Sequence, residues 1–231
     1  MNKVVVVTGA SGGIGKALIR HLSDAGYRVV GLSRRIPEHP PADYRHYEVD
    51  LTDAQSIEKV IMEVRMDFPA LYGLIHNAGV AVMNHLVTLP AEDVQRVFAV
   101  NVLAPVYLTR HLVRPLMRNG RGRIVAVSSV VVPWALEGES IYAASKAALE
   151  KFIQTIAREL APFHITANVI GLPPLKTELT QRVPIEKMEA LLQRTAIRRY
   201  LQPEEIFPVL DMLLDERNDA ITGQSIYLGG P

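Results

Sequence analysis

The chain has no cysteine, no excess of charge of one sign and no long hydrophobic run. Without cysteine it has no disulfides, no thiolate metal ligands and no cysteine nucleophile. The 25 lysine and arginine residues nearly balance the 24 aspartate and glutamate residues, so the net charge of +1 gives no general attraction for nucleic acid or an anionic membrane. The longest mostly apolar stretch, residues 124–136, is shorter than the ~20 residues that cross a bilayer. We expect a soluble cytoplasmic protein that binds no metal, no nucleic acid and no membrane.

Strand and helix patterns alternate along the whole chain. Val4 to Val7 form a β-branched run typical of a buried strand, apolar residues at helical spacing follow up to Leu22, and residues 27–32 form a second apolar strand. This strand–helix–strand unit predicts parallel pairing with a right-handed crossover. Further strands are predicted at 47–49, 71–76, 123–128, 165–170 and 225–228, and further helices at 53–68, 91–118, 140–162 and 203–216. We expect breaks or kinks at Pro105 and Pro115, and a loop over the proline-containing residues 36–44.

The alternation predicts one α/β domain over residues 1–231, with a doubly wound, seven-stranded parallel sheet flanked by helices. In such folds ligands bind outside the carboxyl ends of the strands. We expect residues 1–125 to bind a cofactor, and residues 126–231 to supply the catalytic residues and a substrate lid.

A glycine-rich turn joins the first predicted strand to the first helix. Glycine adopts backbone angles that other residues resist, and it lets the backbone approach a pyrophosphate at the helix N-terminus. The spacing differs from the common dinucleotide fingerprint and fits two patterns, one through Gly9, Gly13 and Gly15 and one through Gly12. An ordinary glycine-rich turn is the alternative. The predicted cofactor contacts here are Gly9, Ser11, Gly12, Gly13, Ile14 and Gly15.

The end of the second strand carries Ser33, Arg34 and Arg35. An acidic residue at this place binds the ribose hydroxyl of NAD, whereas arginine accommodates the 2′-phosphate of NADP. Since guanidinium is a good partner for phosphate, these three residues predict an NADP(H) site with Arg34 as the main contact. Two solvated loop arginines are the alternative.

Tyr142 and Lys146 stand one turn apart in the predicted helix 140–162. Residues four apart share a helix face, so the phenol and the ammonium can reach the same small volume. A cation at ~4 Å in an effective dielectric of ~20 contributes roughly 4 kcal/mol, which would lower the phenol pKa from about 10 to roughly 7 and suit it to acid–base catalysis. Ser129 follows the predicted strand 123–128, where its hydroxyl can stabilise charge on a substrate oxygen.

The glycine turn after a valine strand, the Tyr142–Lys146 pair and Ser129 together resemble the short-chain dehydrogenase/reductase family. The resemblance covers essentially the whole chain, and its length fits the compact, NADP(H)-dependent type with a Rossmann fold. It implies that Tyr142 is the general acid–base, that Ser129 holds the substrate oxygen and that Lys146 also binds the nicotinamide ribose. It further implies that Asn101 holds a water in a proton relay, although Asn101 also fits a helix kink.

The resemblance also implies the remaining cofactor contacts and the assembly. Asp50 and Leu51 are expected to contact the adenine. Asn77, Ala78 and Gly79 are expected to contact the adenosine ribose, and Thr177 the carboxamide or the pyrophosphate. Asp50 also suits a cap of the helix that begins nearby. A homodimer or homotetramer is expected, with its interface formed by the long helices around Pro105 and Ala148.

The chain departs from the family pattern at two points. His76 replaces a common asparagine, and we expect it to pack rather than act as a base. Leu172 and Pro173 stand where Pro–Gly is usual, and because proline fixes φ and removes an amide donor, the shape of the nicotinamide wall stays open. Residues 178–200 fall at the family's substrate lid. They predict an amphipathic helix, with a basic mouth for an acidic or phosphopantetheine-borne substrate as the sharper alternative.

These features predict NADP(H)-dependent transfer of a hydride between nicotinamide and a carbonyl or secondary-alcohol substrate. An apolar pocket beside Ser129, and so an apolar substrate, is expected from Val130, Val131, Val132, Pro133, Trp134 and Leu136. One alternative is a 3-oxoacyl-(acyl-carrier-protein) reductase with the same catalytic residues. Another is a non-catalytic NADP(H)-sensing protein, although such proteins usually lack the tyrosine or lysine that this chain keeps.

Overall fold

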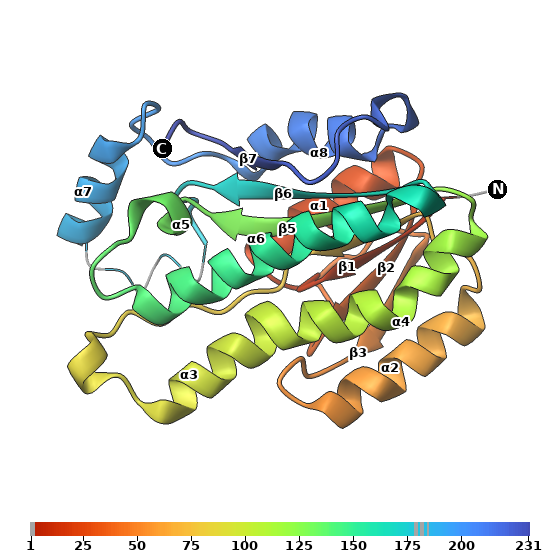
Figure 1. The fold of residues 1–231 in the computed structure, drawn as a ribbon, viewed down its shortest axis with the longest axis horizontal. Coiled ribbons are helices and arrows are strands. Elements are labelled where there is room, and N and C mark those ends of the chain that lie inside the picture. The colour runs from red at the N-terminus through yellow and green to blue at the C-terminus, as the bar shows by residue number, and fades with distance from the viewer. Residues whose placement is uncertain (1–2, 178–179, 181–182, 184) are drawn as a thin grey trace.

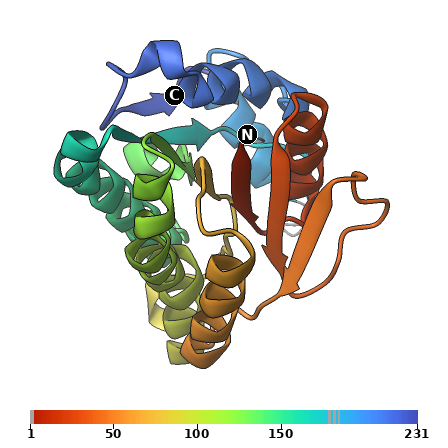
Figure 2. The same cartoon turned by 90° about the vertical axis from the view of Figure 1, so that its right-hand side faces the viewer.

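A parallel sheet of seven strands runs through the computed structural model, which describes residues 3–177, 180, 183 and 185–231. The strands are β1 (Val4–Thr8), β2 (Arg28–Ser33), β3 (Tyr44–Glu48), β4 (Gly73–His76), β5 (Gly122–Ser129), β6 (Ile165–Leu172) and β7 (Ser225–Tyr227). They lie in the order β3-β2-β1-β4-β5-β6-β7, and every neighbouring pair is parallel (Figures 1 and 2). The predicted doubly wound α/β fold is confirmed.

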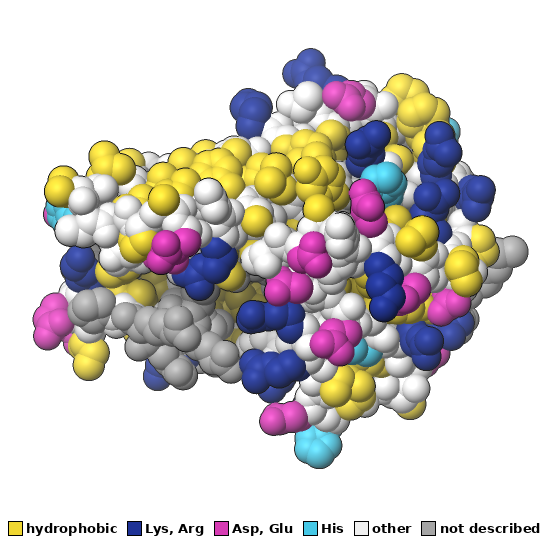
Figure 3. All heavy atoms as spheres, turned by 90° about the horizontal axis from the view of Figure 1, so that it is seen from below, with side chains coloured by type: hydrophobic (Ala, Val, Ile, Leu, Met, Phe, Trp, Pro, Cys, Tyr) yellow, Lys and Arg dark blue, Asp and Glu magenta, His cyan; other side chains and the backbone are white. Residues whose placement is uncertain are grey.

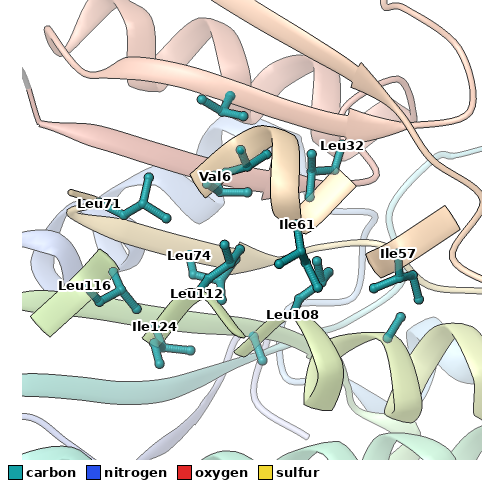
Figure 4. Packing of buried hydrophobic residues seen from close by; sticks show 14 of the residues in the cluster. Val6, Leu32, Ile57, Ile61, Leu71, Leu74, Leu108, Leu112, Leu116 and Ile124 are labelled. Carbon is teal, nitrogen blue, oxygen red and sulfur yellow. The ribbon is translucent and has the colours of Figure 1, made fainter. Parts of the chain in front are cut away.

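Helices cover both faces of the sheet. On one face lie α2 (Ala54–Asp67), α4 (Ala104–Arg118) and α6 (Ser140–Leu160), and on the other lie α1 (Gly13–Asp24) and α8 (Phe207–Leu214) (Figure 1). Side chains alternate along a strand, so β1 sends Val6 into the layer under α2 and α4, and Val5 and Val7 into the layer under α1 and α8. Figure 4 shows the first layer, where Val6 and Leu74 of the sheet lie near Ile61 and Leu108 of the helices. The valine run is apolar throughout because both faces of β1 are buried.

The predicted helix 91–118 is divided, but its prolines do not divide it. Helix α3 (Ala91–Phe98) leads through a π-helical turn at Ala99–Leu103 into α4. Pro105 lies in the first turn of α4, and Pro115 lies inside α4 without ending it. The break or kink expected at these prolines was therefore wrong in its place and cause. It is a π-helical insertion, a feature often found at functional sites, and it contains Asn101.

Two element boundaries differ from their predictions in an informative way. Strand β3 begins at Tyr44, inside the predicted loop, because Tyr44 pairs with Val29 and its ring occupies the space over Gly31, where any Cβ would overlap it. The helix predicted at 203–216 starts as a 3-10 turn at Pro203–Ile206 before α8. Two short helices, α5 (Val131–Trp134) and α7 (Ile185–Arg194), lie after β5 and β6. Among the described residues, no helix combines the length and apolar character that a membrane span needs.

Candidate active site

A cavity of about 480 Å³ opens at the carboxyl ends of the strands. Its walls come from the glycine turn, from the ends of β2, β4, β5 and β6, and from the start of α6. Every predicted cofactor contact, from Gly9 to Thr177, lines it. Of the expected catalytic residues, Ser129, Tyr142 and Lys146 also line the cavity. The structure thus brings together residues from segments far apart in the sequence.

The glycine turn is held in place by the residues that follow β4. Thr8 Oγ1 accepts hydrogen bonds from the backbone amides of Asn77 and Ala78, both at 3.0 Å, and Asn77 Nδ2 donates to the Thr8 carbonyl at 3.0 Å. Gly9 has a φ of +67°, which favours glycine. A Cβ on Gly15 would overlap the carbonyl oxygen of Gly9. The turn therefore requires glycine and leaves room for close approach of an anionic group to the N-terminus of α1.

Ser33, Arg34 and Arg35 form the edge of the cavity at the end of β2, as predicted. Ser33 is buried, and its hydroxyl donates to the carbonyl of Arg35 at 2.9 Å. Both arginines are exposed. The backbone turn made by Ser33 thus presents two guanidinium groups next to the glycine turn.

Asp50 lies at the same end of the cavity, just after β3. Its carboxylate accepts hydrogen bonds from the backbone amide and the hydroxyl of Thr52, at 2.9 and 2.8 Å, and these bonds lower the pKa of Asp50. The cap of α2 is instead Asp53, whose side chain accepts from the amide of Gln55. Asp50 is therefore not the cap of that helix, which was the alternative explanation for it.

Tyr142 and Lys146 lie one turn apart on α6, with Ser129 at the end of β5. Lys146 Nζ lies 6.0 Å from the centre of the Tyr142 ring and donates to the Val127 carbonyl at 2.8 Å. Burial lowers the pKa of Lys146 to about 8. Burial also raises the pKa of Tyr142 to about 12, although a hydrogen bond with Ser129 acts to lower it. The predicted phenol pKa of roughly 7 is wrong for this structure, because the desolvation of the buried phenol has the largest effect on its pKa.

Glu150, which was not among the predicted site residues, supports Lys146 from the next turn of α6. It is buried, and its carboxylate accepts hydrogen bonds from Ser128 Oγ at 2.5 Å, the Tyr227 hydroxyl at 2.7 Å and Ser225 Oγ at 3.2 Å. Its charge raises the pKa of Lys146 against the effect of burial. The sequence did carry one signal for this role, the spacing of four residues after Lys146.

Asn101 does not line the cavity, unlike the other expected catalytic residues. Its side chain is fully buried, with Oδ1 accepting from the Val80 amide and Nδ2 donating to the Val80 carbonyl and to Ser145 Oγ, all at 2.9 Å. It therefore ties the loop after β4 to α6, one residue before Lys146. The side-chain amide of Asn101 therefore bonds to Val80 and Ser145, which lie in other segments, and not to the backbone of its own kinked helix, which was the alternative explanation for it. Its part in a proton relay stays a prediction.

His76 packs in the core, as expected for a residue that is not a base. It is 1% exposed, its Nε2 shares a hydrogen bond with Thr109 Oγ1 at 2.8 Å, and it does not line the cavity. Burial lowers the pKa of His76 to about 3. Such a histidine stays neutral at physiological pH and has no contact with the cavity through which to exchange a proton.

The apolar wall beside Ser129 is smaller than predicted. Val130, Val131 and Leu136 line the cavity, but Val132, Pro133 and Trp134 do not. The reason is the helical turn α5, which directs the Trp134 ring towards the guanidinium of Arg194, 4.9 Å away. Leu172 and Pro173 both line the cavity, so the departure from the family's Pro–Gly lies in its wall.

Helix α7 corresponds to the amphipathic helix predicted within residues 178–200. Met188 and Leu191 on its apolar face line the cavity, and Met188 is buried. Residues 178–179, 181–182 and 184 of the expected lid lie outside the described residues. The described part of the lid therefore supplies apolar side chains to the cavity.

Comparison with known proteins agrees with this fold. The family model for short chain dehydrogenases matches residues 3–187. The 3-oxoacyl-(acyl-carrier-protein) reductase FabG of Escherichia coli (strain K12) is 29% identical over 234 residues, and that of Thermotoga maritima is 31% identical over 237 residues, each alignment covering 99% of this chain and 96% of the relative. The solved structure of 4-hydroxyisoleucine dehydrogenase complexed with NADH matches with a TM-score of 0.88 at 23% identity, over 99% of this chain and 98% of that one. The chain therefore belongs to the short-chain dehydrogenase/reductase family and is an oxidoreductase.

Proposed function

We propose that this protein is an NADP(H)-dependent oxidoreductase that transfers a hydride between the nicotinamide and an apolar carbonyl or secondary-alcohol substrate. The observation that carries the proposal is that Ser129, Tyr142 and Lys146 line the same cavity as the glycine turn. A proton donor and a hydrogen-bond donor for the substrate oxygen thereby share one cavity with a turn that suits a pyrophosphate.

The residues at the strand ends fit a dinucleotide with an additional phosphate. The glycine turn is a cradle that a Cβ on Gly15 would fill, and the N-terminus of α1 favours a pyrophosphate there. Position 33 has a serine in place of a carboxylate, and Arg34 and Arg35 supply two exposed cations beside it. That combination favours a 2′-phosphate over a free ribose hydroxyl. When bound, the cofactor donates or accepts the hydride.

The protein's own residues handle the substrate oxygen and its proton. The Ser129 hydroxyl donates a hydrogen bond to that oxygen and stabilises the charge that develops on it. The Tyr142 hydroxyl gives the proton to this oxygen, or removes it in the reverse direction. Lys146, anchored on the Val127 carbonyl, places a positive charge near the phenol and favours its ionised form. Apolar residues such as Leu136 exclude water from the site.

The test of turnover follows the absorbance of reduced nicotinamide with NADPH and a panel of apolar ketones and alcohols. We expect Tyr142→Phe to lower kcat at least about 10²-fold, the lower end of the range for general acid–base catalysis, and to bind NADPH as tightly as the wild type. Undiminished turnover in this variant would refute the assignment of the proton donor. Tight NADPH binding by the wild type without turnover of any substrate would identify a sensing protein instead.

The preference for NADP(H) is tested by Arg34→Ala. Loss of a charge-assisted contact should weaken NADPH binding about tenfold or more and leave NADH binding nearly unchanged. Arg20→Ala is the control, because Arg20 is also an exposed arginine but lies on α1 outside the cavity. Equal losses for the two cofactors in Arg34→Ala would refute the cofactor preference.

A 3-oxoacyl-(acyl-carrier-protein) reductase is the second candidate, favoured by the identity of about 30% to proteins of that name. Lys187 and Arg194 lie on α7 and would supply positive charge for a phosphopantetheine-borne substrate. A lower KM for a 3-oxoacyl group on its carrier protein than for the same group on a short thiol would support this substrate. We expect Lys187→Glu to remove that difference, and an unchanged difference would count against a basic docking surface.

We also propose that the chain forms a homodimer or homotetramer through α4 and α6, which lie side by side on the outside of the molecule (Figure 1). Figure 3 shows hydrophobic side chains gathered along one long edge of the surface. Leu103, the last residue of the π-helical turn, and Tyr107, near the start of α4, are 46% and 36% exposed, and exposed apolar patches mark interaction surfaces. Light scattering should give a multiple of the chain mass for the wild type and the single mass for Tyr107→Glu. A monomeric wild type would refute the proposal.

A further inference from the structure

Two carboxylates among the described residues line the cavity, and they lie at opposite functional ends of it. Asp50 belongs to the cofactor contacts and is satisfied by Thr52. Glu139 directly precedes α6, three residues before Tyr142. Three helical residues rise about 4.5 Å, so Glu139 lies within one turn of the proton donor. Nothing in the proposed reaction uses the Glu139 carboxyl group.

The Glu139 carboxyl group is partly buried and incompletely satisfied. Its Oε2 is buried and has no hydrogen-bond partner among the residues that the structure describes. Glu139 occupies the N-cap position of α6, but its side chain makes no capping hydrogen bond. Burial raises the pKa of Glu139 to about 7, and the charge of Lys187 on α7 acts in the opposite direction. A buried polar atom without a partner is costly, which favours a ligand as its partner.

The charge of Glu139 also opposes the chemistry assigned to Tyr142. It raises the pKa of the phenol, whereas acid–base catalysis near neutral pH needs a lower value. A hydrogen-bond donor bound to Glu139 would satisfy the buried oxygen, and a cationic donor would also offset the negative charge. Apolar side chains also contribute to the walls of the cavity, among them Val130, Val131, Leu136, Met188 and Leu191.

We propose that Glu139 determines substrate specificity by accepting a hydrogen bond from a hydroxyl or ammonium group on the substrate. The substrate class is then an apolar carbonyl compound or alcohol that carries this donor a few bonds from the reacting carbon. The inference rests on the proposed function, which puts the reacting carbon beside Ser129 and Tyr142. A plain hydrocarbon ketone would leave the buried oxygen unpaired, and sites built to bind a polar group discriminate strongly against analogues that lack it.

Three ketones of similar shape test the inference: 4-methyl-, 4-hydroxy- and 4-aminocyclohexanone, titrated calorimetrically into protein saturated with NADP⁺. We expect the wild type to bind the hydroxy or the amino ketone at least about tenfold more tightly than the methyl ketone. In Glu139→Leu this preference should disappear. Glu139→Gln should keep a preference for the hydroxy ketone and weaken one for the amino ketone, because an amide oxygen accepts hydrogen bonds from both donors but carries no charge to pair with the ammonium. These variants therefore separate the two kinds of donor.

Glu137→Gln is the matched control. Glu137 lies two residues before Glu139, but its side chain is 81% exposed, pairs with His85 and does not line the cavity. This variant should keep the wild-type order of affinities. Thermal unfolding of each variant shows whether it is folded before it is titrated.

Equal affinity of the wild type for the three ketones, including binding of none of them, would overturn the inference. So would a preference that survives in a folded Glu139→Leu. Turnover of the same ketones with NADPH is measured separately. The expected order of affinities without any turnover would count against the proposed reductase, whereas turnover without that order would count against the role of Glu139 alone.

Discussion

Replacing His76 by asparagine should make the folded protein less sensitive to mild acid. His76 is 1% exposed, and burial lowers its pKa from 6.5 to about 3, with the positive charge of Lys146 acting in the same direction. Between these two pH values the native histidine stays neutral, while the histidine of the unfolded chain takes up a proton. The unfolded state therefore binds more protons over this interval. The contribution of the neutral, buried His76 to the stability of the native state is fully present above pH 6.5 and is lost as the pH falls from 6.5 towards 3.

The size of the effect follows from the two pKa values. A pH of 5 is about 1.5 units below the pKa of the histidine in the unfolded chain. Each unit corresponds to a change of about 1.4 kcal/mol in the unfolding free energy. The wild type should therefore lose about 2 kcal/mol of unfolding free energy between about pH 7.5 and pH 5 through His76 alone. Asparagine can still hydrogen-bond with Thr109, the partner of His76, but it does not titrate. A typical domain has only about 5–15 kcal/mol of stability, so this loss is measurable.

Urea unfolding of the wild type and of His76→Asn, at about pH 7.5 and pH 5, measures the difference directly. We expect the fall in unfolding free energy to be about 2 kcal/mol smaller in the variant. His39→Asn is the control, because His39 lies on the surface and its variant should follow the wild type. Equal pH dependence of the wild type and His76→Asn would refute the reasoning that His76 is buried in its neutral form.

Three further changes test the turn, the core and the support of Lys146. Gly15→Ala adds a methyl group that overlaps the Gly9 carbonyl, so it should weaken NADPH binding at least about tenfold in a fluorescence titration; unchanged affinity would contradict the tight turn. Leu108→Ala, at a fully buried site between the sheet and α2, should lower the unfolding free energy in urea by about 2–5 kcal/mol, and a loss below about 1 kcal/mol would contradict its place in the core. Glu150→Gln removes the charge that raises the pKa of Lys146, so the alkaline limb of the pH profile of turnover should move to lower pH; a limb that stays or moves up would contradict the pairing.

Features encoded in contiguous residues could be predicted from the sequence. The parallel sheet follows from the alternation of helix and strand patterns, because a strand, a helix and a parallel strand connect in only one common way. The glycine turn is recognisable from spacing within a few residues. The pairing of Tyr142 with Lys146 needs only the geometry of one helical turn.

Contacts between distant segments could not be predicted. Glu150 is satisfied by Ser128 and Tyr227, which come from β5 and β7. The side chain of Asn101 forms hydrogen bonds with Val80 in the loop after β4. The ring of Trp134 contacts Arg194 of α7 and does not line the cavity. Such partners depend on how elements pack, and no local pattern records that packing.

Local periodicity and turn chemistry were therefore enough to predict the α/β fold and the strand ends that form the cavity, whereas the resemblance to the family supplied part of the residues that line it. The electrostatic state of those residues depended on three-dimensional packing. Tyr142 and Lys146 have the predicted spacing, but burial by elements from across the chain moves their pKa values to about 12 and about 8. Spacing along a helix is a local property, whereas desolvation sums the effect of every atom packed around a group.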